Sequence, residues 1–165
     1  MSRAFVKEGD GQSLDDPPPR PARVQPCYIT RRGFVALREA LEEAQAALAW
    51  SAQAESLGDE AARKVLARRI HEITQILQDA VPVDVTGQQA EVVRFGATVD
   101  VIDEAGQNAR YTIVGEDEVA PERRRISWVS PLGRALIGHR VGDEVEWQRP
   151  DGTRRLEITS LCYED

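Results

Sequence analysis

The hydrophobic periodicity of the chain switches at Pro82, and this switch limits the folds that are open to it. Between Tyr28 and Pro82, apolar residues recur every three or four positions, as they do on one face of a helix. After Pro82 the pattern becomes short alternating runs separated by turn residues, which predicts strands. The chain should therefore have an α+β fold, with the helices in one part and the sheet in another.

The helical part predicts two arms that fold back on each other. Thr30 is a suitable N-cap for the first arm, and Gly58 with Asp59 favours a tight reversal before the second. Arms of about 22 to 24 residues would be roughly 33 to 36 Å long. We assign an antiparallel helical hairpin (a coiled coil) to residues 28–81. Its predicted apolar stripes are Phe34, Leu37, Leu41, Ala44 and Leu48 on the first arm, and Leu66, Ile70, Ile73, Leu77 and Ala80 on the second.

The part after the hairpin, residues 82–165, predicts an antiparallel sheet of five or six strands. The helix-like segment within it is PLGRALIG, which places Pro131 in a first helical turn, where its missing N–H costs nothing. This segment should cover one face of the sheet. The predicted strands lie in residues 90–96, 97–103, 110–115, 125–130, 143–149 and 154–161.

The first 27 residues predict a flexible tail, since they are poor in apolar residues and contain the run DDPPPRP. Over the whole chain, 28 acidic residues outnumber 21 basic ones, for a net charge of −7. This balance argues against tight, sequence-independent binding to free nucleic acid.

The two cysteines, Cys27 and Cys162, lie far apart and outside any zinc-ligand spacing. No apolar run is long enough to span a bilayer, and the N-terminus lacks the charged-then-apolar order of a signal peptide. We therefore expect a cytoplasmic protein that has no membrane partner, keeps reduced thiols and has no cofactor of its own.

Two clusters of motifs resemble the Gre family of bacterial transcription elongation factors. The first is YITRRGFVALREAL at the start of the hairpin, and the second comprises FGATVDVID, YTIVGEDE and ISWVSPLGRALIGHRVGDEVEW in the sheet part. The resemblance covers about residues 28–163, with both clusters in the family's order. The leader SRAFVKE also resembles that of a short-hairpin proteobacterial subgroup.

The resemblance implies a protein that is not an enzyme but a monomeric accessory factor of RNA polymerase. Its hairpin would enter the polymerase's secondary channel, near the nascent RNA. Its C-terminal domain, FKBP-like (similar to the FK506-binding proteins), would dock at the channel entrance. The contact residues carried over from the family are Ser130, Pro131, Leu132 and Arg134, with Val129 where relatives often have Asp or Asn.

The hairpin tip is where the family's transcript-cleavage factors carry two acidic residues. A second Mg²⁺ beside a nucleic-acid phosphate needs hard oxygen ligands, and one carboxylate rarely holds it alone. This sequence retains Asp59, which the resemblance makes a shared ligand of the polymerase's Mg²⁺, but Ala62 stands at the second position. Glu55 and Glu60 are the other candidate tip acids.

The resemblance also indicates a hairpin that is shorter than in typical cleavage factors by about two turns per arm, or roughly 11 Å of reach. It therefore favours polymerase binding with weak or no cleavage stimulation. The second arm carries Arg63, Lys64 and Arg68, which could face RNA in the channel. Without the resemblance, the tip acids and this basic cluster are typical of a solvated helix and turn.

Four alternatives remain open from the sequence. The chain could be a true cleavage factor that rescues backtracked complexes, or a regulator of nucleoside diphosphate kinase, which belongs to a family similar to the Gre factors. A prolyl isomerase is the enzyme alternative, because that activity occurs on the same C-terminal fold, although fold alone does not carry function. A protein that dimerises through its hairpin is the fourth.

Overall fold

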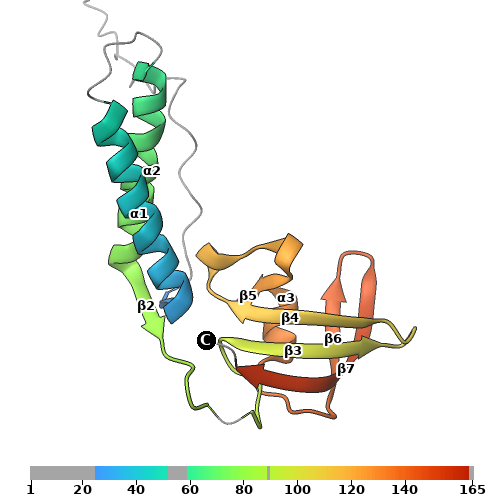
Figure 1. Cartoon of the computed structure of the whole chain (residues 1–165). Coiled ribbons are helices and arrows are strands. Elements are labelled where there is room, and N and C mark those ends of the chain that lie inside the picture. The colour runs from blue at the N-terminus through green and yellow to red at the C-terminus, as the bar shows by residue number, and fades with distance from the viewer. Residues whose placement is uncertain (1–24, 52–58, 89, 164–165) are drawn as a thin grey trace, which may run out of the picture.

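The computed structural model describes residues 25–51, 59–88 and 90–163. It confirms the two-part α+β architecture. The hairpin consists of α1 (Arg31–Ser51) and α2 (Asp59–Asp79), each of 21 residues and so about 32 Å long. It rises beside the sheet domain, and its base adjoins that domain (Figure 1).

The seam between α1 and α2 is the one that the sequence predicts. Every residue of the α1 stripe is buried or half-buried, and Ala44 is the most enclosed of them. On α2 the buried residues are Ile73 and Ile76. Ile76 was not in the predicted stripe, but it lies three positions after Ile73 and therefore on the same helix face.

A pair of short strands closes the base of the hairpin, and the sequence analysis did not predict it. Strand β1 (Cys27–Thr30) pairs in parallel with β2 (Ala80–Val83). Ala80, expected at the end of the second apolar stripe, instead begins β2. Pro82 can occupy this position because a two-stranded pair leaves one edge of each strand open, so the missing N–H need not break a ladder.

The second part is a five-stranded sheet in the order β5-β4-β3-β7-β6. Neighbouring strands are antiparallel except for β4 and β5, which run parallel, so the sheet is mixed and not wholly antiparallel as predicted. Two 3-10 turns, η1 (Glu116–Glu118) and η2 (Pro121–Arg123), lie between β4 and β5 and reverse the chain so that these two strands run parallel. The strands are β3 (Ala97–Asp103), β4 (Asn108–Val114), β5 (Arg125–Ser127), β6 (Glu144–Arg149) and β7 (Gly152–Tyr163).

The predicted strand at residues 90–96 is wrong. Val93 is fully buried, but its backbone exchanges hydrogen bonds with the loop after α3 (Pro131–Leu136): its N–H donates to the His139 carbonyl, and its carbonyl accepts from the Gly138 N–H. Gly96 has φ +83°, a left-handed conformation that ends any extended run. The alternating apolar pattern here therefore marks an anchored loop.

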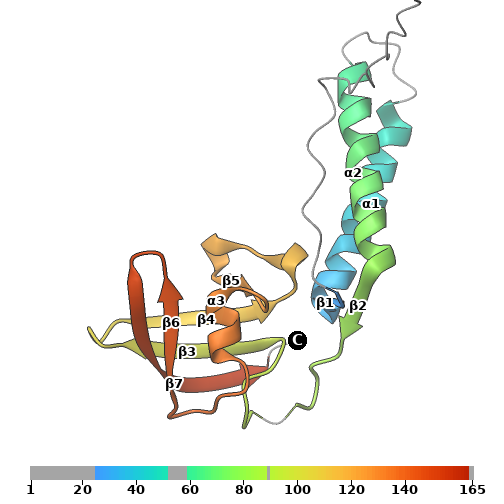
Figure 2. The same ribbon diagram turned by 180° about the vertical axis from the view of Figure 1, so that it is seen from behind.

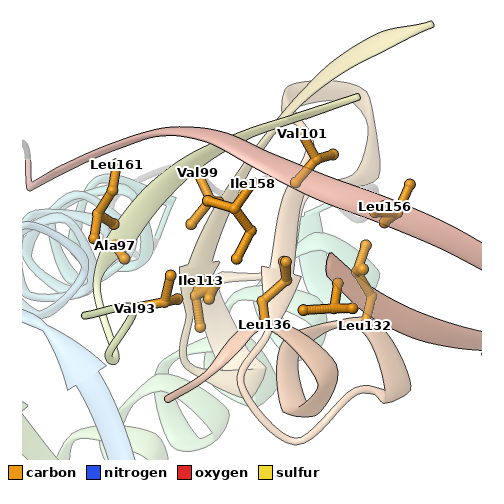
Figure 3. Close-up of a cluster of buried hydrophobic side chains, with 11 residues drawn as sticks. Val93, Ala97, Val99, Val101, Ile113, Leu132, Leu136, Leu156, Ile158 and Leu161 are labelled. Atoms are coloured by element: carbon orange, nitrogen blue, oxygen red, sulfur yellow. The ribbon is translucent and has the colours of Figure 1, made fainter. Parts of the chain in front are cut away.

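The sheet domain has one apolar core, formed between the sheet and α3 (Pro131–Leu136). Figure 2 shows α3 lying across one face of the strands. Figure 3 shows Leu132 and Leu136 of α3 projecting toward side chains from β3, β4 and β7. The buried members are Val93, Ala97, Val99, Val101, Ile113, Leu132, Leu136, Val145, Leu156, Ile158 and Leu161.

The side chain of Glu118 joins the hairpin to the sheet domain and is only 3% exposed. Its Oε2 accepts from the Thr30 N–H at 2.8 Å and from the Gly115 N–H at 3.1 Å. Its Oε1 accepts from the Thr30 hydroxyl at 2.5 Å and from Arg125 Nη2 at 2.8 Å. The Thr30 hydroxyl in turn accepts from the Gly33 N–H at 3.0 Å, which confirms Thr30 as the cap of α1.

Glycines allow this close approach. A Cβ added to Gly33 would lie 2.1 Å from Glu118 Oε1, and one added to Gly115 would lie 2.2 Å from the Tyr28 carbonyl oxygen. Beside them, the ring of Tyr28 lies 5.3 Å from the ring of Trp128 and 5.7 Å from that of Phe95, centroid to centroid. The hairpin base therefore contacts the sheet domain through both a buried carboxylate and an aromatic cluster.

An ion pair across the sheet makes the stability of the domain depend on pH. Asp100 on β3 is directly opposite Arg110 on β4, and the guanidinium donates to both carboxylate oxygens at 2.7 and 2.8 Å. Hydrogen bonding from Arg110 is the main cause that lowers the pKa of Asp100 below its ordinary value of 3.8. This pair therefore stabilises the fold above that pH, and the stabilisation is lost as the pH falls through the lower pKa of the folded state.

We predict that Asp100→Asn lowers the free energy of unfolding by about 0.2–1 kcal/mol at pH 7, the range for a cross-strand charge pair. The difference from the wild type should shrink as the pH drops below the ordinary aspartate pKa of 3.8. Urea unfolding over a pH series measures it, with Arg110→Gln as the reciprocal variant. A difference that stays constant down to strongly acidic pH would contradict the assignment.

Candidate functional site

The Ser-Pro turn at the start of α3 is held by its own hydrogen bonds. The Ser130 hydroxyl accepts from the Gly133 N–H at 3.0 Å and donates to the Ser127 carbonyl at 2.6 Å. Ser130 is thus the N-cap of α3, with Pro131 at the first helical position. Because α3 has only six residues, this cap and the preceding turn determine where the helix begins.

The four predicted contact residues differ in exposure. Pro131 and Arg134 are exposed, Ser130 is half-buried, and Leu132 is only 3% exposed because it packs in the core of the sheet domain. A Cβ on Gly133 would lie 2.3 Å from the Ser127 carbonyl, so α3 sits directly on the end of β5. Pro131 and Arg134 are therefore the solvent-facing residues of the turn, while Leu132 packs in the core beneath it.

An apolar groove of about 300 Å³ lies beside this turn. Pro131 and Ser130 form one of its sides, and half-buried Tyr111 and Trp147 line it as well, with their ring centroids 6.5 Å apart in an edge-on arrangement. The sequence analysis did not identify this groove. Tyr111 and Trp147 are 36 positions apart, on strands that are not neighbours in the sheet. No local sequence pattern therefore predicts that their rings lie close together.

The hairpin tip lies largely outside the described residues. Glu55 falls within 52–58, and α2 begins at Asp59, whose side chain is likewise not described. Glu60 is highly exposed, and its Oε1 lies 3.7 Å from Lys64 Nζ one turn later. Such an exposed pair exchanges freely with solvent, so the Glu60 carboxylate remains available to another cation. Ala62 is exposed on the same first turn of α2.

The predicted RNA-facing residues lie along α2. Lys64 pairs with Glu60, and Arg68 Nε lies 3.1 Å from Glu72 Oε1, both at i,i+4 spacing; Glu72 is half-buried and the other three residues are exposed. Arg63 is half-buried. These pairs are ordinary on a solvated helix face and add only a few tenths of a kcal/mol each, so a role toward RNA stays a prediction.

Within residues 25–51, 59–88 and 90–163, no group of three or more His, Cys, Asp or Glu side chains is arranged to hold a metal ion. None of the described helices is both long enough and apolar enough to cross a membrane.

Comparisons with known proteins show the family. Residues 88–163 match the family model described as "Transcription elongation factor, GreA/GreB, C-term". Transcription elongation factor GreA of Trichlorobacter lovleyi is 38% identical over 152 residues, an alignment that covers 82% of this chain and 96% of that protein. GreA of Nautilia profundicola is 48% identical over 99 residues, covering 59% of this chain and 61% of the relative's length.

Among solved structures, the GreA factor homolog 1 protein of Thermus thermophilus is 27% identical, with coverage of 82% of this chain and 97% of that one and a TM-score of 0.41. The sequence matches establish that this chain belongs to the GreA/GreB family of transcription elongation factors. Gre factors are accessory elongation factors and not enzymes themselves.

We predict that Ser130→Ala destabilises the sheet domain by about 1 kcal/mol, because it removes the cap of α3 and the bond to the Ser127 carbonyl. Pro131→Ala should change stability by less than half of that, since the exposed ring makes no hydrogen bond that the fold needs. Thermal and urea unfolding of both variants measure the difference. Equal losses would show that the serine hydroxyl does not hold the turn.

Proposed function

We propose that this chain binds RNA polymerase at the secondary channel, docks through the Ser-Pro turn and stimulates transcript cleavage weakly or not at all. The observation that carries the proposal is the division of the turn into a buried support, Leu132, and an exposed face formed by Pro131 and Arg134. An exposed proline on a turn fixed by its own cap is already ordered before binding, which lowers the entropy cost of docking.

The hairpin would enter the channel while the sheet domain stays at the entrance. Its two arms of 21 residues give about 32 Å of reach from the base. The buried Glu118 network supports this arrangement, because it ties the first turn of α1 to the sheet domain that carries the Ser-Pro turn. Insertion and docking would then occur as one rigid movement of a monomer.

A length comparison supports the shortened hairpin. The alignment with the Trichlorobacter lovleyi protein runs over 152 positions, yet 82% of this 165-residue chain is only about 135 residues, so about 17 of those positions have no residue here. A hairpin shorter by two turns in each arm would lack about 14 residues. Such a tip would hold its carboxylates back from the reacting phosphate.

The chemistry of the tip supports weak cleavage as well. The carboxylates of Asp59 and Glu60 are suitable oxygen ligands for Mg²⁺, and the exposed Glu60 could turn from Lys64 toward it. With Ala62 in place of a second acid, the tip would share an ion already held by the polymerase instead of supplying a site of its own. When bound, the ion would polarise the phosphate and activate water.

The test is a pair of measurements on stalled, backtracked elongation complexes: binding of the factor and cleavage of the nascent RNA. We predict that the wild type binds, that cleavage stays near the level without factor, and that Asp59→Ala does not change it. Arg134→Glu should weaken binding about 10-fold or more while the protein keeps its stability, because it reverses the charge on the docking face.

The factor should also inhibit a cleavage-competent Gre protein in a competition assay, since both would occupy one channel. Strong cleavage by the wild type that disappears in Asp59→Ala would overturn the proposal and establish a true cleavage factor. Failure to bind the polymerase at all would refute docking through this surface.

A further inference from the structure

A second cavity, of about 190 Å³, lies between the hairpin base and the sheet, and Arg125 is the one lining residue that it shares with the groove beside the docking turn. Arginines from both parts of the molecule line it. Arg31 and Arg32 come from the first turn of α1, whereas Arg123 and Arg125 come from η2 and β5. From the sequence, the basic run at residues 123–125 is a charged loop leading into a strand with no functional role, and the fold brings Arg123 and Arg125 to the start of α1.

The charge in this cavity is not balanced by the acids around it. Arg125 is bound to the buried Glu118, and Arg31 lies 3.8 Å from Asp84 in a loose, exposed pair. For Arg32 and Arg123, no carboxylate of the described residues lies within 4.0 Å. The cavity thus concentrates positive charge in a chain whose net charge is −7, and such local charge favours an anion.

Two threonine hydroxyls add donors at the sheet side of the cavity. Thr98 is only 5% exposed, and its Oγ1 lies 3.1 Å from Oγ1 of Thr112 on the neighbouring strand; both residues line the cavity. One hydroxyl donates to the other, so one O–H proton of the pair has no acceptor among the described residues. An acceptor placed in the cavity would satisfy this donor.

The size and chemistry of the cavity define the ligand. Sites that enclose drug-sized molecules have roughly 300–1,000 Å³, so about 190 Å³ fits a smaller group. Guanidinium groups match phosphate oxygens in bidentate geometry. We propose that this cavity is a binding site for a diphosphate group, either free pyrophosphate or the phosphates of a nucleotide whose base and sugar stay outside.

A bound diphosphate would act across the joint between the two parts of the molecule. Arg31 and Arg32 would hold it from the hairpin, and Arg123 with the threonine pair would hold it from the sheet domain. The ligand would add to the link that Glu118 makes and stabilise the folded state according to its affinity and concentration. This proposal does not depend on polymerase docking.

The experiment is calorimetric titration of the full chain with sodium pyrophosphate and, separately, with ADP. We expect one site per chain and affinities within a few-fold of each other for the two ligands. Arg123→Gln and Arg32→Gln should each weaken binding about 10-fold, and Thr98→Val several-fold. Arg38→Gln, on an exposed α1 position outside the cavity, is the matched control and should leave the affinity unchanged.

Amide chemical shifts provide a second readout that does not depend on the variants. On titration, the amides of Gly96, Thr98 and Thr112 should move together and saturate with the calorimetric affinity. No binding at millimolar pyrophosphate would overturn the proposal. So would binding that Arg38→Gln weakens as much as Arg123→Gln does, because that would show diffuse attraction to surface arginines. Tight ADP binding without pyrophosphate binding would mean that the site does not recognise the diphosphate.

Discussion

One buried carboxylate, that of Glu118, determines how the two halves of this protein are joined. A buried charge is tolerated only when it is paired and hydrogen-bonded, and Glu118 has four donors: the N–H and hydroxyl of Thr30, the Gly115 N–H and the guanidinium of Arg125. Thr30 caps α1, and Arg125 begins β5. The same group therefore fixes both the start of the hairpin and the strand that leads into the Ser-Pro turn. Loss of one partner would leave the buried carboxylate of Glu118 incompletely paired, which would weaken the whole joint.

This constraint bears on the proposed function, in which two distant surfaces would act at once. The docking turn and the hairpin tip would be useful together only if the angle between the hairpin and the sheet domain is fixed, since an arm about 32 Å long converts a small rotation at its base into a large displacement at its tip. The arginine cavity lies at the same joint, because Thr30 and Arg125, two partners of Glu118, also line it, and a diphosphate bound there would strengthen the connection.

Most of the fold could be predicted from local patterns, because the apolar stripes of α1 and α2 and the alternation in β3 to β7 depend on near neighbours in sequence. The elements that were missed depend on distant partners. The β1–β2 pair joins residues more than 50 positions apart, and the run at residues 90–96 has a strand's alternation but bonds to the loop after α3. The Ser-Pro turn could be found from its motif. Glu118 could not, because nothing in EDEVAPE distinguishes a buried acid from its exposed neighbours.

The most direct test of this account is the distribution of distances between spin labels on the hairpin and the sheet domain. Val65 on α2 and Val141 before β6 are exposed, so each would be replaced by a cysteine that carries a label. Cys27 and Cys162 would be replaced by alanine so that only the two labelling sites react. We predict one narrow distribution for this labelled protein and for Glu122→Gln, an exposed acid in η2, and a broad one for Glu118→Gln. An equally narrow distribution in Glu118→Gln would show that the buried carboxylate does not fix the hairpin.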